Sequence, residues 1–174
     1  MGTGDRVSDC RRVRAAGSQE HGRILAEEPI GPGEVVLRLG GALRSEPTQH
    51  SIQVGLHQHL DPGPAGGPAG PWGEHPWRYL NHGCEPNARV AGLDLVAVRP
   101  IASGEEVTFN YNATEWRLAS PFTCWCGAPD CAGAISGFQD LSPAERERLR
   151  PLLSDHLLAH LPARPPSAAD GTGA

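Results

Sequence analysis

The sequence predicts a mainly β (α+β) fold of short strands, followed by short helices near the C-terminus. Its 174 residues include 22 glycines and 17 prolines but few aromatic residues, which favours many turns and short strands over long helices. Apolar and polar residues alternate in brief runs, such as VVLRL, between Gly-rich turns. The length is sufficient for one domain with its own hydrophobic core.

The predicted strands lie in the first 112 residues. Between Gly22 and Leu39 the pattern is a strand, a Gly turn and a second strand. Later segments are predicted as a third strand over 51–60, a hairpin over 88–98 and a further strand over 107–112. A Gly/Pro-rich loop over 61–76 separates the third strand from the hairpin.

A weak internal repeat links two of these regions. The pattern A-x-x-P-I-x-x-G-E-x-V fits Ala26 to Val36 and again Ala97 to Val107. It indicates either turn chemistry that a β-rich chain simply reuses, or two similar small sheets on either side of a shared site.

The C-terminal region changes to a helical pattern. Ser142 and Glu145 form a capping-box signature with Pro143 at the first helical position, and Pro151 is expected to divide the segment into two short helices. The apolar stripe is predicted to be a packing face, with an interaction helix as the alternative; it consists of Leu149, Leu152, Leu153, Leu157 and Leu158. Residues 1–18 are expected to be a flexible leader and residues 162–174 a disordered tail.

Four of the five cysteines suggest a metal site. Cys124, Cys126 and Cys131 lie within eight residues, and a disulfide between the first two would be strained. Structural zinc takes four ligands in a tetrahedron. Cys84 is the preferred fourth ligand, with Cys10 and His82 as competitors. Such a site has no open position for a catalytic water, so zinc here is predicted to be structural.

Charge and hydropathy exclude several classes. A net charge of −5 argues against a general nucleic-acid binder, including a zinc-stabilised one. The sequence has no apolar run near the roughly 18 residues that span a bilayer and no secretion signal at its start, so we expect a protein of the reducing cytoplasm. All 15 basic residues are arginine, so the chain cannot modify a lysine of its own.

Three motifs in order carry a resemblance to a known family. RYLNHGCEPN at 78–87, GEEVTFNYN at 104–112 and FTCWCGAPDCAGAISGF at 122–138 resemble the core motifs and the cysteine-rich post-SET tail of SET-domain protein lysine methyltransferases. The resemblance covers about 20–138. It implies a SET-type β fold of small sheets with a pseudoknot. The implied division is a SET domain over 19–119, a post-SET zinc segment over 120–138 and a helical extension over 139–161.

The resemblance also implies roles for single residues. Tyr111 is the expected catalytic residue, and Phe109 is expected to line the lysine channel. S-adenosylmethionine is expected to contact residues from the first strand, the NHGC segment and the tail, namely His21, Gly22, Arg23, Asn81, His82 and Trp125. Either Trp125 or the tail around Phe138 is expected to cover the adenine or the channel. The family's four-thiolate zinc site matches Cys84, Cys124, Cys126 and Cys131.

The implied activity is S-adenosylmethionine-dependent methylation of a lysine side chain in a protein or peptide. In-line methyl transfer requires alignment and a neutral amine, which a narrow dry channel and a tyrosine hydroxyl favour. The segment HGRILA at 21–26 departs from the family pattern because Gly22 is its only glycine. The alternative is therefore a degenerate SET module that binds cofactor or a protein without turnover. The sequence does not indicate the substrate protein, the degree of methylation or the oligomer.

Overall fold

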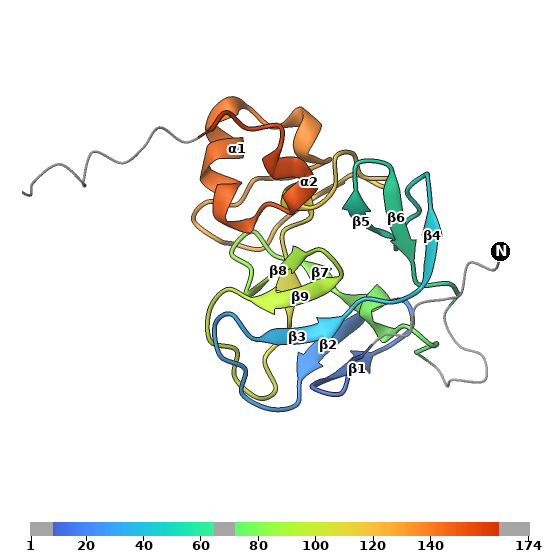
Figure 1. Cartoon of the computed structure of the whole chain (residues 1–174). Coiled ribbons are helices and arrows are strands. Elements are labelled where there is room, and N and C mark those ends of the chain that lie inside the picture. The colour runs from blue at the N-terminus through green and yellow to red at the C-terminus, as the bar shows by residue number, and fades with distance from the viewer. Residues whose placement is uncertain (1–8, 65–71, 164–174) are drawn as a thin grey trace, which may run out of the picture.

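The computed structural model describes residues 9–64 and 72–163, and the chain forms several small sheets beside a group of short helices (Figure 1). The strands are β1 (Val13–Gly17), β2 (Gly22–Ala26), β3 (Val35–Arg38), β4 (Ala42–Arg44), β5 (Ile52–Gly55), β6 (Gln58–Asp61), β7 (Asn81–His82), β8 (Ala88–Ala91), β9 (Asp94–Ala97), β10 (Thr108–Phe109), β11 (Phe122–Thr123) and β12 (Ala134–Ile135). The α-helices are α1 (Pro143–Leu149) and α2 (Asp155–Leu158), and the 3₁₀ helices are η1 (Pro76–Tyr79), η2 (Tyr111–Ala113), η3 (Phe138–Asp140) and η4 (Arg150–Leu152). The predicted class, mainly β with short C-terminal helices, is confirmed.

The described strands pair mostly with near neighbours in the sequence. Two sheets have three strands, in the orders β3-β9-β8 and β4-β6-β5, and three have two strands, β1-β2, β7-β10 and β11-β12. The hairpin predicted over 88–98 is confirmed as β8–β9, with a positive φ of 60° at Gly92 in its turn. Within the part of the chain that the structure describes, only β7 and β10 pair in parallel. The pseudoknot stays a prediction.

The single strand predicted over 51–60 is wrong, because this segment turns back on itself as the β5–β6 hairpin. The side chain of Gln53 donates to the carbonyls of Gly55 (3.0 Å) and Leu56 (3.3 Å), which fixes the turn. Side-chain bonds to a local turn leave no trace in the alternation of apolar residues. The strand predicted over 107–112 is also too long, since η2 replaces the strand from Tyr111 onwards.

Part of the predicted leader is ordered structure. β1 pairs with β2 over its whole length, and Val13 is buried in the core. Beside it, Arg12 forms ion pairs with Glu28 (2.6 Å) and Glu34 (3.0 Å). The expectation of a flexible leader therefore fails for 13–17, while residues 1–8 lie outside the described residues.

The two copies of the internal repeat pair with each other. Ile30 and Ile101 exchange both backbone hydrogen bonds at 2.9 Å, and the amides of Gly33 and Gly104 bind the carbonyls of Ala97 (2.8 Å) and Ala26 (2.7 Å). Both glycines have nearly the same positive φ, 82° and 83°. The copies thus form one pseudosymmetric crossing. Of the two interpretations of the repeat, this pairing does not fit two separate sheets on either side of a shared site.

Two buried clusters make up the core. The larger lies among the sheets and includes the fully buried Trp77, while the smaller lies under the C-terminal helices around Phe138. The capping box of α1 and the break after Leu149 are confirmed. The leucine stripe is confirmed as a packing face, with buried side chains from Leu149, Leu153 and Leu157. No described helix is long and apolar enough to cross a membrane.

Candidate functional site

The two polar motifs of the middle of the chain meet at the β7–β10 crossing. Thr108 lies opposite Asn81, and Phe109 lies opposite His82. Asn87 ties the motifs together: its Oδ1 accepts from the Thr108 amide (2.9 Å), and its Nδ2 donates to the Glu106 carbonyl (2.8 Å). A fully buried amide with satisfied hydrogen bonds on both sides fixes the register of this short pair.

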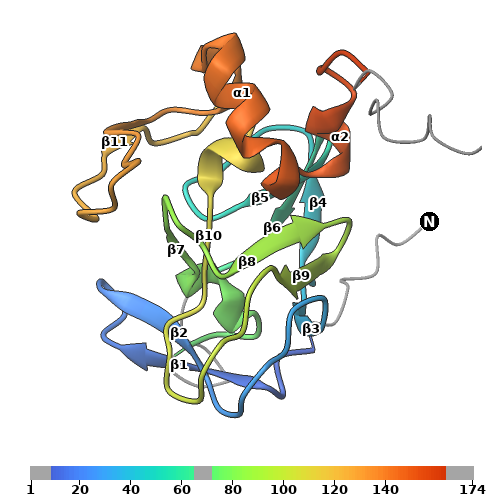
Figure 2. The same cartoon turned by 90° about the vertical axis from the view of Figure 1, so that its left-hand side faces the viewer.

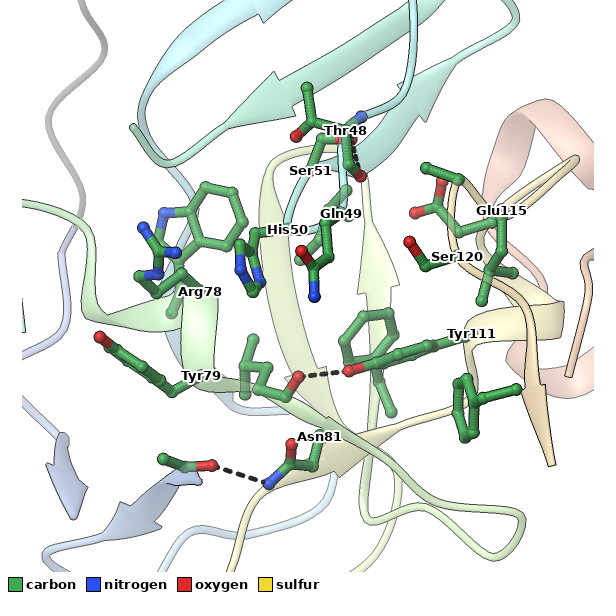
Figure 3. A pocket seen from close by; sticks show the side chains of 18 of the residues that line it. Thr48, Gln49, His50, Ser51, Arg78, Tyr79, Asn81, Tyr111, Glu115 and Ser120 are labelled. Atoms are coloured by element: carbon green, nitrogen blue, oxygen red, sulfur yellow. Dashed lines mark hydrogen bonds between the residues drawn. The ribbon is translucent and has the colours of Figure 1, made fainter. Parts of the chain in front are cut away.

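A cavity of about 390 Å³ opens beside this crossing (Figure 3). Its volume lies in the range of small-molecule sites, about 300–1,000 Å³. The lining combines apolar and aromatic side chains with polar groups from the loop before β5, from η1, and from the segment after η2. The cavity lining includes Gly22, His50, Arg78, Tyr79, Asn81, Phe109, Tyr111, Glu115 and Phe122.

Tyr111 lies at the centre of this lining (Figure 3). Its hydroxyl donates to the Leu80 carbonyl at 2.6 Å, and its ring packs against Phe109 with centroids 4.8 Å apart. Burial, followed by the nearby carboxylates Glu115 and Glu106, raises the pKa of the Tyr111 phenol above its usual range. The hydroxyl therefore stays protonated at neutral pH, as a directed polar group beside the apolar ring of Phe109.

Asn81 and Gly22 join the cavity floor to β2. The Asn81 Nδ2 donates to the Gly22 carbonyl (3.1 Å) and to Glu106 Oε1 (2.8 Å). A Cβ on Gly22 would lie 2.2 Å from the ring of Tyr79. The HGRILA segment thus contains the regular strand β2. Glycine is required at position 22 because the ring of Tyr79 lies so close to the backbone there.

Alanine at Gly22 is expected to destabilise the fold by about 1–3 kcal/mol, because the ring of Tyr79 is buried and has to shift. Urea unfolding of Gly22→Ala measures the loss. Gly31→Ala is the matched control, since its new Cβ meets nothing closer than 3.5 Å. Equal stability of the two variants would show that the Tyr79 ring moves freely.

The His82 ring lies between the cavity and the cysteines. Its Nδ1 accepts from the Tyr111 amide (3.2 Å), so Nε2 carries the hydrogen and lies 3.2 Å from the sulfur of Cys84. The ring packs edge-on against Tyr111 and Phe122, with centroids 5.3 and 5.8 Å away. Burial lowers the pKa of His82 to about 4, so the imidazole is neutral.

Other residues predicted to bind the cofactor lie elsewhere. His21 precedes β2 and Arg23 lies on it, and neither is among the residues that line the cavity, so their roles stay predictions. Trp125 is 89% exposed and does not reach the cavity, and Phe138 is fully buried in the smaller core. The aromatic residue of the tail that does line the cavity is Phe122, and no pattern in the sequence favoured it over Trp125.

The four cysteines predicted to bind zinc come together. The sulfurs of Cys84, Cys124, Cys126 and Cys131 all lie within 4.8 Å of one another, and Cys84 lies 3.9 Å from both Cys124 and Cys131. Tetrahedral zinc with Zn–S bonds of about 2.3 Å places its sulfurs roughly 3.8 Å apart, so the cluster fits this ion. Cys10 packs against the larger core instead.

Zinc held by these four cysteines would fasten the tail to the NHGC segment. The hairpin β11–β12 of the tail, together with its loop, projects from the body of the fold (Figure 2). Beyond the sulfurs, the contact between the two segments includes the Ala132 amide, which donates to the Cys84 sulfur at 3.5 Å. Because Phe122 begins this hairpin, a metal at the cysteines would also help to hold one wall of the cavity.

Glu115 is a cavity residue that sequence reasoning missed. Its side chain is 6% exposed, and its Oε1 accepts from the Gln53 amide at 2.8 Å. Burial raises the pKa of this carboxyl to about 8, against an ordinary 4.5. No pattern in TEWR distinguishes it from a surface glutamate, because its burial comes from β5, 62 residues earlier in the chain.

Glu115 is expected to make the stability of the protein depend on pH. The folded state holds this proton up to about pH 8, whereas the unfolded chain loses it near pH 4.5, so the free energy of unfolding falls as pH rises between these values. The full shift corresponds to on the order of 4 kcal/mol. Glu115→Gln keeps the acceptor for Gln53 and removes the titration, so the variant is expected to be the more stable protein at pH 8.5.

Urea unfolding of both zinc-saturated proteins at pH 5 and pH 8.5 measures this difference. The advantage of the variant should be small at pH 5 and reach a few kcal/mol at pH 8.5. The exposed Glu74→Gln serves as the control. An advantage that does not change with pH would mean that the Glu115 carboxyl ionises normally in the fold.

Comparison with known proteins identifies the family. The model of the SET domain matches residues 22–112. The chain is 36% identical over 85 residues to the methyltransferase flvH of Aspergillus flavus, covering 45% of this chain and 48% of flvH. Against the Histone-lysine N-methyltransferase, H3 lysine-36 specific, of Aspergillus oryzae it is 40% identical over 68 residues, covering 34% of this chain and 7% of that protein.

Solved structures with a related shape include the KRYPTONITE complex with mCHG DNA and SAH. That likeness has a TM-score of 0.49 at 20% identity and covers 68% of this chain and 27% of the other. The methyltransferase domain of human SETMAR gives a TM-score of 0.48 at 18% identity, covering 70% and 56%. Neither likeness bears on the activity of this chain. The family model covers more than half of the chain and includes both motifs of the β7–β10 crossing, and the chain therefore belongs to the SET domain family.

Proposed function

We propose that the protein is a lysine N-methyltransferase that uses S-adenosylmethionine. The observation that carries the proposal is the Tyr111 hydroxyl, protonated and held by the Leu80 carbonyl, in a cavity at the crossing of the two motifs. Membership of the SET domain family and the resemblance to named methyltransferases support it. The chain spans about half of flvH and a small part of the histone methyltransferase, so the reaction is assigned from the site.

The cavity suits the cofactor and an amine in size and chemistry. S-adenosylmethionine, when bound, supplies a methyl group on a sulfonium sulfur. Its binding is assigned to the wall formed by Gly22 and Asn81, with Phe122 from the tail covering it. The lysine side chain is assigned to the side of Phe109 and Tyr111. Catalysis is thus assigned to the SET domain over 19–119, and covering of the cofactor is assigned to the post-SET segment over 120–138.

The chain's own residues orient the amine. A cavity lined by Phe109, Ile52 and Trp77 disfavours the charged ammonium and so lowers the pKa of an entering amine. The Leu80 carbonyl and the Tyr111 hydroxyl lie side by side and can hold the nitrogen by hydrogen bonds. Such alignment is the main requirement of an in-line displacement.

The substrate class is proposed as a lysine of a protein or peptide. The name of the Aspergillus oryzae relative specifies lysine 36 of histone H3, and the name of flvH specifies no substrate. The alternative is a module that binds without turnover. Its support is that the Asn81 amide already donates to Gly22 and Glu106, so it is engaged within the chain.

Labelled S-adenosylmethionine and a lysine peptide library separate the two proposals. Label in peptide lysine supports the enzyme, while cofactor binding by calorimetry without transfer supports the binding module. The assay has no lysine background from the protein, since the chain contains no lysine. A peptide library with arginine in place of lysine is the control, and label in those peptides would contradict a lysine-directed reaction.

A further inference from the structure

Glu115 is fixed at the cavity wall by its main chain. Its amide donates to the Tyr111 carbonyl at 2.8 Å, and its carbonyl accepts from the Phe138 amide at 2.8 Å. The first bond continues the turn of η2, so the two side chains that begin and end this turn, Tyr111 and Glu115, both reach the same cavity. Figure 3 shows the Glu115 carboxyl directed into the cavity on the same side as Ser120.

Only one of its two carboxyl oxygens is engaged. Oε1 accepts from the Gln53 amide, and the Gln53 side chain in turn accepts from the Trp116 amide at 2.7 Å. Within 9–64 and 72–163, no hydrogen bond or ion pair involves Oε2. Because the Glu115 carboxyl lines the cavity, this second oxygen is open to a ligand there.

Two other acidic groups that are partly or fully buried have a partner cation. Asp61 pairs with Arg44 at 2.8 Å, and Glu105 pairs with Arg99 at 2.8 Å. No cation among the described residues pairs with Glu115, although it is the more deeply buried group.

The other charged groups around the cavity leave the space beside the second carboxyl oxygen of Glu115 open to a ligand. The groups that share the cavity with Glu115 and can carry charge are Glu20, His50, Arg78, Tyr79 and Tyr111. In Figure 3, Arg78 and His50 lie across the cavity from Glu115. Outside the cavity wall, the ring of His156 on α2 contacts the Thr114 carbonyl at 2.9 Å, His160 packs on Trp116, and His59 lies on β6 beside β5. Burial lowers the pKa of His50, His59 and His156, so these rings are neutral near pH 7.

We propose that Glu115 is a further catalytic residue, which binds the ammonium form of the substrate amine and accepts its proton. This inference rests on the proposed methyl transfer. One N–H bond of the ammonium breaks and an O–H bond forms on Glu115, which leaves the nitrogen lone pair free. The N–C bond then forms as the S–C bond of the donor breaks, the product leaves as an ammonium ion, and the Glu115 proton passes to water at the cavity mouth.

The pKa of the Glu115 carboxyl suits the transfer of a proton from the substrate amine. A carboxyl with a pKa of about 8 is partly ionised near neutral pH and is far more basic than an exposed glutamate. An amine in solution holds its proton up to a pKa of about 10.4, and desolvation in the cavity lowers this value. The two groups therefore approach each other in proton affinity, which is the condition for efficient transfer.

Glu115→Gln tests the proposal, because the amide keeps the acceptor for Gln53 but can neither carry charge nor take a proton. At pH 7.5 we expect kcat/KM for a lysine peptide to fall by about 10²-fold or more. In the wild type kcat/KM should rise with an apparent pKa near 8. In the variant the rise should move toward pH 10, where the free amine itself becomes abundant, so the gap narrows at high pH.

Several results overturn the proposal. A variant within twofold of wild type at pH 7.5, or a loss that stays constant from pH 7 to 10, would leave Glu115 a structural role only. Glu74→Gln, an exposed change away from the cavity, is expected to match the wild type at every pH.

A binding measurement separates this inference from the proposed function. Calorimetric titration of n-pentylamine at pH 8 should show binding to the wild type and at least tenfold weaker binding to Glu115→Gln. If the wild type transfers no methyl group, the proposed function fails, and the amine titration alone decides whether Glu115 binds a cation. Equal amine binding by both proteins overturns the inference whatever the activity.

Discussion

Serine in place of Cys84 is expected to lower bound zinc below one ion per chain and to release the tail from the NHGC segment. Four sulfurs within 4.8 Å of one another fit one zinc ion, and the tail holds three of them. Because structural zinc contributes about 10–16 kcal/mol of binding free energy in small domains, loss of one ligand is a severe change. We expect the melting temperature to drop by roughly 10 °C, equivalent to about 3 kcal/mol or more in a domain of this size.

The release of the tail also affects the cavity. Pro121 and Phe122 line it, and Phe122 packs on both His82 and Tyr111. Cofactor affinity, measured by calorimetry, is therefore expected to fall together with zinc content, measured by mass spectrometry. Cys10→Ser removes a thiol that packs against the larger core and should keep the full zinc content. Unchanged zinc in Cys84→Ser would mean that another residue supplies the fourth ligand.

Phenylalanine in place of Tyr111 is expected to reduce kcat by 10²-fold or more while cofactor affinity changes less than threefold. The substitution removes one hydroxyl, which donates to the Leu80 carbonyl at 2.6 Å, and leaves the packing on Phe109 in place. Loss of a single directed polar group at a reacting centre has an effect of this size. Stability should fall by about 1 kcal/mol, because the Leu80 carbonyl loses its donor.

The second tyrosine of the chain provides the comparison. The hydroxyl of Tyr79 is buried and has no partner among the described residues. Tyr79→Phe therefore removes a hydroxyl from the same cavity wall, with a much smaller expected loss in kcat and no loss of stability. Single-turnover assays with a saturating cofactor measure both variants. Similar losses in the two would show that the position of the Tyr111 hydroxyl has no special importance.

The sequence predicted the features that short motifs specify. The C-x-C-x4-C spacing with Cys84 required the four thiols to converge, since zinc accepts few other arrangements. Ser142, Pro143 and Glu145 specified the start of α1 by local hydrogen bonds. Such features depend on a few residues with strict geometry, so they can be predicted without the rest of the fold.

Features that depend on distant contacts were missed. Glu115 owes its burial and its pKa to β5, and the β5–β6 turn is fixed by Gln53, which also binds the Trp116 amide. The choice of Phe122 over Trp125 at the cavity follows from the direction in which the zinc cluster holds the hairpin. None of these contacts has a periodic or spaced signal in the sequence.

The pairing of the two repeat copies has a consequence for biosynthesis. Ile30 and Ile101 complete each other's backbone bonds across 71 residues, and Ala26 depends in the same way on Gly104 and Glu105. A nascent chain that ends before residue 97 therefore exposes an edge with unmet donors and acceptors, open to pairing with other chains. The two repeat copies can pair only after a long loop closes, so their pairing is expected to be a late and slow step of folding. Two separately produced fragments, each with one repeat copy, would carry complementary edges at this pairing. The region between 62 and 75 is therefore a natural point at which to divide the gene for a reassembly assay.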